Sequence, residues 1–445
     1  MDRLRKLFTS EEQQYEALEN SETERDGPTT RKQSGTRYVE YGIFLLLGIS
    51  MLWAWNMFLA AGPYFQHRFR GNQWIFDHFQ AAEITVSTVT SLSTMLVLTR
   101  LQANASYPKR IVVSLVMNMA LFALLAASTA IDTSAEVYFG FLMITIFSTS
   151  VATGLCQNGV FAYVSGFGEP KFTQGIMTGQ AVAGVLPCIA QILSVLSIRS
   201  GGDNSSTDGP APPGPPLVQW TAALSYFLTA TIISTITLLA FGYLLARNQK
   251  SVRLEDSIPS LAGERQDRKS IPLLHLLRKL IWLSGGVFVT FAVTMVFPVF
   301  TQRILSVRPP AEQPPILQPP SFIPLALLFW NIGDLTGRLI TAIPSLSLVL
   351  RPRVVFTLAV ARIVFVGLYH LCNLRGEGAI VNSDFFYLVI VQLLFGLSNG
   401  YIGSTCMIGA GVWVDEEERE AAGGFMGLCL VSGLTFGSVL SFFIT

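Results

Sequence analysis

The chain has 445 residues, of which 51% are hydrophobic and 13% are charged, and its formal net charge is +1. Soluble domains carry roughly a quarter charged residues, so this composition excludes a water-soluble globular protein and indicates an integral membrane protein. The lysines and arginines form no basic face, which excludes nucleic acid as a partner. The five cysteines lie in apolar runs without metal-ligand spacing, so we expect no metal and no cofactor.

The chain begins with a polar segment rich in Glu, Arg, Ser and Gln. It cannot bury enough apolar surface to fold and is too polar for a signal peptide, so residues 1–37 are predicted to be a disordered cytosolic tail. Residues Tyr15 to Leu18 have the tyrosine-x-x-hydrophobic form that a sorting adaptor binds. Two locations are therefore open, a vacuolar or endolysosomal membrane and the plasma membrane.

Apolar runs of about 20 residues, bounded by Pro, Gly or charge, predict eleven membrane-spanning helices. The runs do not alternate polar and apolar residues as the strands of a membrane barrel would, so the fold class is all-α. The predicted spans lie near residues 39–65, 80–101, 110–131, 137–166, 173–199, 217–246, 276–303, 321–345, 352–373, 384–413 and 420–445.

The distribution of positive charge predicts the orientation of these spans. With a cytosolic N-terminus, 22 of the 30 lysines and arginines fall in the tail and the inside loops, and six fall outside. The one long charged inside loop, residues 247–275, separates six spans from five. We therefore expect an N-terminal bundle over residues 38–246 and a C-terminal bundle over residues 276–445, joined by a cytosolic linker.

Two charged residues, Asp334 and Arg338, lie near the middle of the eighth span, where an ionised side chain costs about 2.5–3.5 kcal/mol. They are four residues apart, so they share one helix face and can pair. One interpretation is an ion pair that locks helices together. The favoured interpretation is that this face lines a water-accessible cavity and offers an acceptor and a donor to a polyhydroxylated solute.

Other polar residues also lie within the spans. Arg362 lies about ten residues from the cytosolic end of its span, so a structural role with partial snorkelling is favoured. Glu83 lies near the outer end of the second span and is expected at the interface. The amides Gln157, Asn331 and Asn399 either join helices or contact a solute.

An enzyme is not expected. No second aspartate accompanies Asp334 within the spans, no histidine or lysine base pairs with an intramembrane serine, and no GxxxxGK[ST] motif occurs. Two unequal helical bundles with buried polar residues in both are typical of a carrier that works by alternating access. A small polar solute is the expected substrate.

Several stretches then resemble the equilibrative nucleoside transporter family, in the same order and from the first span to the last, and most like a fungal member. The eighth-span N-x-x-D-x-x-G-R motif, Asn331 to Arg338, is the most specific. The others are residues 52–58, Gln157, residues 174–184, the SNGY of residues 398–401, and Gly433, Leu434 and Gly437.

This resemblance implies a major-facilitator-like fold of six plus five helices that transports nucleosides or nucleobases, either facilitatively or linked to protons. Trp55, Leu52 and Gln157 would contact the base, and Leu434 would close the pocket. Asp334, Arg338 and Asn331 would form its polar side.

By the same resemblance, Arg110 and Glu420 would form a cytosolic gate. Ala54 replaces the proline of the family's first-span signature, so the shape of the pocket does not carry over. The alternatives are another small polar solute, an organic cation, and a polytopic scaffold without transport. The retained Arg338 argues against a cation.

Overall fold

The computed structural model describes residues 30–102, 105–202, 216–256, 271–309, 312–376 and 378–444. Within these residues, eleven helical spans are long and apolar enough to cross a membrane, which confirms the predicted number and the all-α fold class. The sorting pattern from Tyr15 to Leu18 lies outside the described residues.

The N-terminal bundle holds six of the spans. Its first helix begins at Thr30, so residues 30–37 of the expected tail are helical, and its last helix continues through residues 247–256 of the expected linker. The helices are α2 (Thr30–Ala60), α3 (Gly62–Arg68), α4 (Gln73–Arg100), α5 (Tyr107–Ser128), α6 (Ala135–Gly166), α7 (Pro170–Gly202) and α8 (Pro216–Asp256).

The C-terminal bundle holds five spans, several of which are interrupted. Pro298 lacks the N–H that would bond to the carbonyl of residue 294, and the helix breaks there into two pieces. The helices are α9 (Leu273–Lys279), α10 (Ile281–Thr294), α11 (Val296–Thr301), α12 (Pro319–Ile340), α13 (Pro352–Ala361), α14 (Val364–Tyr369), the π-helix η4 (Phe386–Leu393), α15 (Leu394–Val412) and α16 (Arg419–Ile444). Three short 3-10 turns connect them: η2 (Pro315–Leu317), η3 (Pro344–Leu346) and η5 (Glu416–Glu418).

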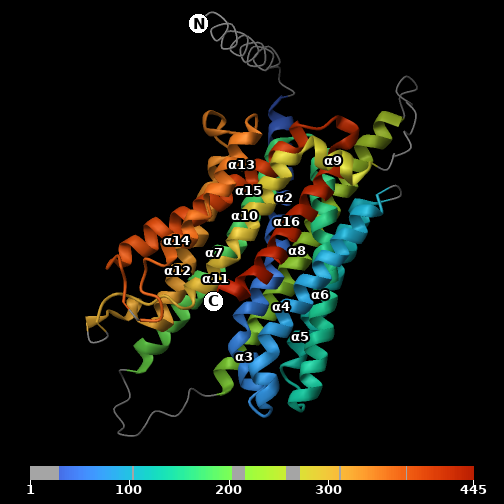
Figure 1. The fold of residues 1–445 in the computed structure, drawn as a ribbon. Helices are drawn as coiled ribbons and strands as arrows, with labels where there is room; N and C mark the ends of the chain where they lie inside the picture. Colours follow the sequence, from blue (N-terminus) through green and yellow to red (C-terminus); the bar gives the residue numbers. More distant parts are fainter. Residues whose placement is uncertain are drawn as a thin grey trace, which may run out of the picture.

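The two ends of the molecule differ in how the bundles meet. We call them the α9 end, at the top of Figure 1 where α2 also begins, and the α3 end, at the bottom. At the α9 end one continuous hydrophobic core contains residues of both bundles. Toward the α3 end each bundle has a core of its own, one among α2 to α6 and α8 and the other among α11, α12, α14, η4 and α15. The bundles are therefore joined at the α9 end.

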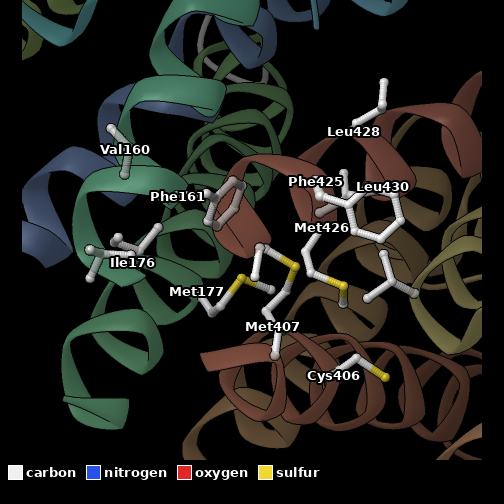
Figure 2. Close-up of a cluster of buried hydrophobic side chains, with 14 of the residues drawn as sticks. Val160, Phe161, Ile176, Met177, Cys406, Met407, Phe425, Met426, Leu428 and Leu430 are labelled. Carbon is white, nitrogen blue, oxygen red and sulfur yellow. The ribbon is translucent and has the colours of Figure 1, made fainter. Parts of the chain in front are cut away.

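The shared core contains a group of methionines, which we call the methionine seam. Figure 2 shows Met177 of α7, Met407 of α15 and Met426 of α16 meeting between the two bundles, and each is at most 3% exposed. Methionine side chains are unbranched and flexible, so they fill irregular gaps between helices. A seam of this kind can part and close again without a unique packing arrangement.

Candidate functional site

Asp334 and Arg338 form a buried ion pair on α12. Arg338 Nε donates to Asp334 Oδ2 at 2.8 Å, and the two residues are 4% and 2% exposed, respectively. The predicted spacing of one helical turn therefore places both charges on one face. Such a pair removes most of the cost of burying either ion alone.

The guanidinium of Arg338 also reaches the other bundle. Its Nη1 donates to the backbone oxygen of Met177 at 2.6 Å and to Gln180 Oε1 at 3.0 Å, both on α7. The pair is consequently a link between the bundles. Gln180 is a partner that the sequence interpretation did not single out.

The second carboxylate oxygen of Asp334 extends the hydrogen-bond network to other helices of the C-terminal bundle. Asn399 Nδ2 on α15 donates to Asp334 Oδ1 at 2.7 Å, and the Thr294 hydroxyl on α10 donates to Asn399 Oδ1 at 2.7 Å. Thr294 in turn accepts from Arg362 Nη2 at 3.1 Å. We call this buried run from Gln180 to Arg362 the polar chain.

Arg362 ends the polar chain and does not snorkel. It lies between α13 and α14, is 2% exposed, donates to Ser398 Oγ at 3.1 Å and has its guanidinium 4.7 Å from the centre of the Phe395 ring. These contacts fit the structural role that the sequence favoured. With Arg338, it gives the polar chain two guanidinium groups and one carboxylate.

Close packing of glycines brings α12 and α15 near enough for these contacts. A Cβ at Gly337 would lie 2.1 Å from the Leu397 oxygen, and one at Gly400 would lie 1.9 Å from the Asp334 oxygen. Side chains at these positions would push the helices apart. The glycine pairs of the two helices therefore set the distance from Asp334 to Asn399.

Asn331 lies one turn before Asp334, also at the contact with α7. Its Nδ2 donates to the Leu327 oxygen at 2.9 Å and lies 3.5 Å from Cys188 Sγ, and its Oδ1 fills the space that a Cβ at Gly184 would need. The side chain is half-buried. It faces the N-terminal bundle as Arg338 does.

Four other predicted site residues lie on α2, α6 and α16, and none of them forms a hydrogen bond or ion pair with the polar chain as the structure describes it. Gln157 on α6 is 6% exposed, while Leu52 and Trp55 on α2 and Leu434 on α16 are half-buried. Within the described residues these four side chains form no hydrogen bond, ion pair or ring contact. The indole of Trp55 and the amide of Gln157 therefore keep their hydrogen-bonding groups free, whereas Leu434 packs against the shared core.

The predicted gate residues have separate surroundings. Arg110 donates to Asn158 Oδ1 and, at 2.7 Å, to the Leu101 oxygen. Glu420 lies against α6, where a Cβ at Gly166 would be 3.1 Å from its Oε1. Both residues lie on helices of the shared core, near the α9 end.

Glu83 differs from its expected position. It is 5% exposed, and its Oε1 has no hydrogen-bond partner within the described residues. The expectation of an interfacial side chain was wrong, because α4 begins at Gln73, well before the predicted start of the span, and the side chain is buried within the bundle. The sequence placed Glu83 near the end of its span, whereas the helix extends further to Gln73 and the side chain is buried.

Comparisons with known proteins agree with this architecture. A model of the family described as "Nucleoside transporter" matches residues 142–253 and 247–445. The chain is 27% identical to the nucleoside transporter FUN26 of Saccharomyces cerevisiae, over 93% of this chain and 85% of that protein. It is 26% identical to mouse equilibrative nucleoside transporter 1, over 93% and 98% of the two chains.

Solved structures of major facilitator superfamily transporters share the fold. The transporter FucP in its outward conformation superposes with a TM-score of 0.54 at 13% identity, covering 91% of this chain and 96% of that one. The proton:xylose symporter XylE gives a TM-score of 0.56 at 10% identity, with 90% and 86% covered.

Proposed function

Because the chain belongs to the nucleoside transporter family, we propose that it carries nucleosides across a membrane by alternating access, with the polar chain as one side of its substrate site. The observation that carries the proposal is the position of Arg338. It is anchored to Asp334 in one bundle and bonded to α7 in the other. A solute bound there would contact both halves of the carrier, as alternating access requires.

The chemistry of the polar chain suits a hydroxyl-rich solute. Ribose hydroxyls both donate and accept, so they can bond to Asp334 and to Arg338, and Asn331 adds an amide on the same helix. Two guanidinium groups against one carboxylate disfavour an organic cation. The ion pair would loosen as substrate replaces part of its contacts.

The base would lie on the opposite side of the site. Trp55 offers a flat apolar face for stacking, and Gln157 offers an amide that bonds a base edge in either sense. Leu52 and Leu434 would supply apolar walls. The proposal is supported by the indole of Trp55 and the amide of Gln157, which form no hydrogen bond among the described residues and can therefore bond to a base without first breaking a contact within the fold.

The arrangement of the cores supports a conformation closed at the α9 end. If this end is cytosolic, as the charge distribution predicts, the carrier is outward-facing. Arg110 and Glu420 would then belong to the closed gate, with Asn158 holding Arg110 beside α16, where a Cβ at Gly424 would lie 3.2 Å from its Nδ2.

Proton linkage is favoured by one observation, the burial of Glu83. An ionised carboxylate without a partner is costly to bury, and a proton is the simplest partner it can take. Uptake would then rise with an inward proton gradient. Glu83→Gln would remove this response, whereas Glu136→Gln, at an exposed carboxylate of α6, would leave it unchanged.

A sorting signal in the N-terminal tail would determine the membrane in which the carrier works. Tyr15 to Leu18 would recruit a sorting adaptor and direct the protein to a vacuolar or endolysosomal membrane, and without that interaction it would remain at the plasma membrane. Tyr15→Ala separates the two, because it would redistribute a tagged protein to the plasma membrane only if the signal is read.

The proposed function is tested by uptake of radiolabelled adenosine and uridine into proteoliposomes. The intact chain should show saturable uptake that Gln157→Ala strongly reduces, while Gln302→Ala, at an exposed amide of the α3 end, should have no effect. Folded protein that takes up neither nucleoside would refute the proposal. The remaining readings would then be another polar solute or a scaffold without transport.

A further inference from the structure

A pocket of about 430 Å³ opens at the α9 end of the C-terminal bundle, away from the polar chain. It lies between the start of α10, the segment that leads into α13, and the end of α15. The lining residues that matter here are Trp282, Leu350, Arg351, Arg353, Val354 and Trp413.

The pocket is positively charged. Arg351 and Arg353 are both exposed, and neither forms an ion pair with any described residue. The nearby carboxylate of Asp415 is held at 2.6 Å by Lys279 instead. None of the described residues that line the pocket is acidic, so its two guanidinium groups are available to an anion. Guanidinium groups bind phosphate in a planar, two-point geometry.

Two tryptophans form the walls and hold the pocket in shape. Trp413 Nε1 donates to the Val349 oxygen at 3.0 Å, which fixes the segment before α13 against the end of α15. The Arg353 guanidinium lies 5.7 Å from the centre of the Trp282 ring. The walls are therefore built by contacts within one bundle and do not depend on the position of the other.

The pocket lies at the depth where three spans end. Trp282 is the second residue of the span Ile281–Thr301, Arg351 precedes the span Pro352–Tyr369, and Trp413 follows the span Phe386–Val412. Tryptophan is enriched where a membrane protein meets the lipid headgroups. Leu350 and Val354 beside the arginines are 64% and 45% exposed, which suits contact with acyl chains and not with water.

We propose that this pocket binds the phosphate headgroup of an anionic phospholipid. Arg351 and Arg353 bond to the phosphate, the two indoles flank the headgroup, and the acyl chains lie along Leu350 and Val354. A soluble phosphate compound would offer the same anion. The apolar side of the pocket favours the lipid, as does the predicted cytosolic side, where anionic lipids gather.

The test is native mass spectrometry of the purified full chain in detergent, titrated with phosphatidylserine, phosphatidylcholine or inorganic phosphate. The unaltered chain should bind phosphatidylserine at least tenfold more tightly than phosphatidylcholine. The double variant Arg351→Gln, Arg353→Gln should weaken phosphatidylserine binding by about 30-fold. Each of the two arginines contributes a similar share of the attraction to the anionic lipid, and the variant loses both shares. Replacing both by lysine should weaken it less.

The matched control replaces Arg303 and Arg308, at the α3 end, by glutamine and should retain binding. Equal binding of the two lipids by the unaltered chain, or equal loss in the control, would overturn the proposal. Saturable binding of inorganic phosphate that the Arg351 and Arg353 variant abolishes, without any lipid preference, would assign the pocket to a soluble phosphate and overturn the lipid. No nucleoside is present, so the result is independent of transport.

Discussion

Replacing Asp334 by asparagine perturbs the polar chain most directly. The carboxylate accepts from Arg338 on one oxygen and from Asn399 on the other. An amide has a single oxygen, so its NH₂ must face one of these donors. In either orientation Arg338 keeps only neutral acceptors, and its charge is left without a counter-ion at 4% exposure.

The loss of stability in Asp334→Asn depends on whether a lost hydrogen bond or an uncompensated buried charge dominates. A lost hydrogen bond between membrane helices costs only about 0.6 kcal/mol on average. Removing one partner of a buried ion pair costs about 3–5 kcal/mol, because an uncompensated charge remains. We expect the larger figure for Asp334→Asn. The control Asp415→Asn breaks an ion pair whose aspartate side chain is 82% exposed, and it should cost at most about 1 kcal/mol.

The assay uses the cysteines of the chain as reporters. Four of the five are buried and Cys429 is half-buried, so a thiol-reactive dye reacts as the protein unfolds on heating. Asp334→Asn should lower Tm by roughly 5 °C or more and abolish uptake, whereas Asp415→Asn should do neither. Adding Arg338→Gln to Asp334→Asn should restore part of the stability without restoring uptake. Equal Tm values for the two single variants would refute the argument that Asp334→Asn leaves Arg338 as a buried, uncompensated charge.

Three further predictions concern residues outside the polar chain. Trp55→Ala should reduce nucleoside uptake at least tenfold with little change in Tm, whereas Trp53→Ala should lower Tm because that indole packs in the core of its bundle. Gly423→Val should disrupt closure at the α9 end, since a Cβ there would lie 2.2 Å from a backbone oxygen of α6. The control Gly411→Val should leave closure unchanged, because a Cβ at Gly411 meets open space. Labelling of a cysteine introduced into the gate measures how far the α9 end is closed. Glu83→Gln should make uptake independent of external pH, and a persistent pH response in that variant would exclude Glu83 as the proton site.

The sequence was sufficient to predict features that depend on a single helix. The pairing of Asp334 with Arg338 follows from a spacing of four residues, and the number of spans follows from apolar length. The rest of the polar chain joins residues far apart in sequence, such as Arg338 with Gln180 and Arg362 with Thr294. Those contacts depend on how helices rotate and pack.

Two other differences have identifiable causes. The position of Glu83 was predicted too close to the end of its span, because α4 begins at Gln73 and not near residue 80, and the burial of its side chain depends on how the helices pack. The break in the seventh span carried a signal in the sequence, Pro298, which the apolar pattern alone concealed. The fold class was therefore accessible from local patterns, while the partners within the site required the packed structure.

The methionine seam makes the resting conformation sensitive to temperature. Met177, Met407 and Met426 are buried between the bundles, and opening the α9 end to water would expose them. Exposure of apolar surface increases the heat capacity, and the free energy that favours its burial decreases on cooling. The fraction of carriers open at the α9 end should consequently rise as temperature falls, so transport rates measured in the cold would report a shifted conformational equilibrium as well as slower motion.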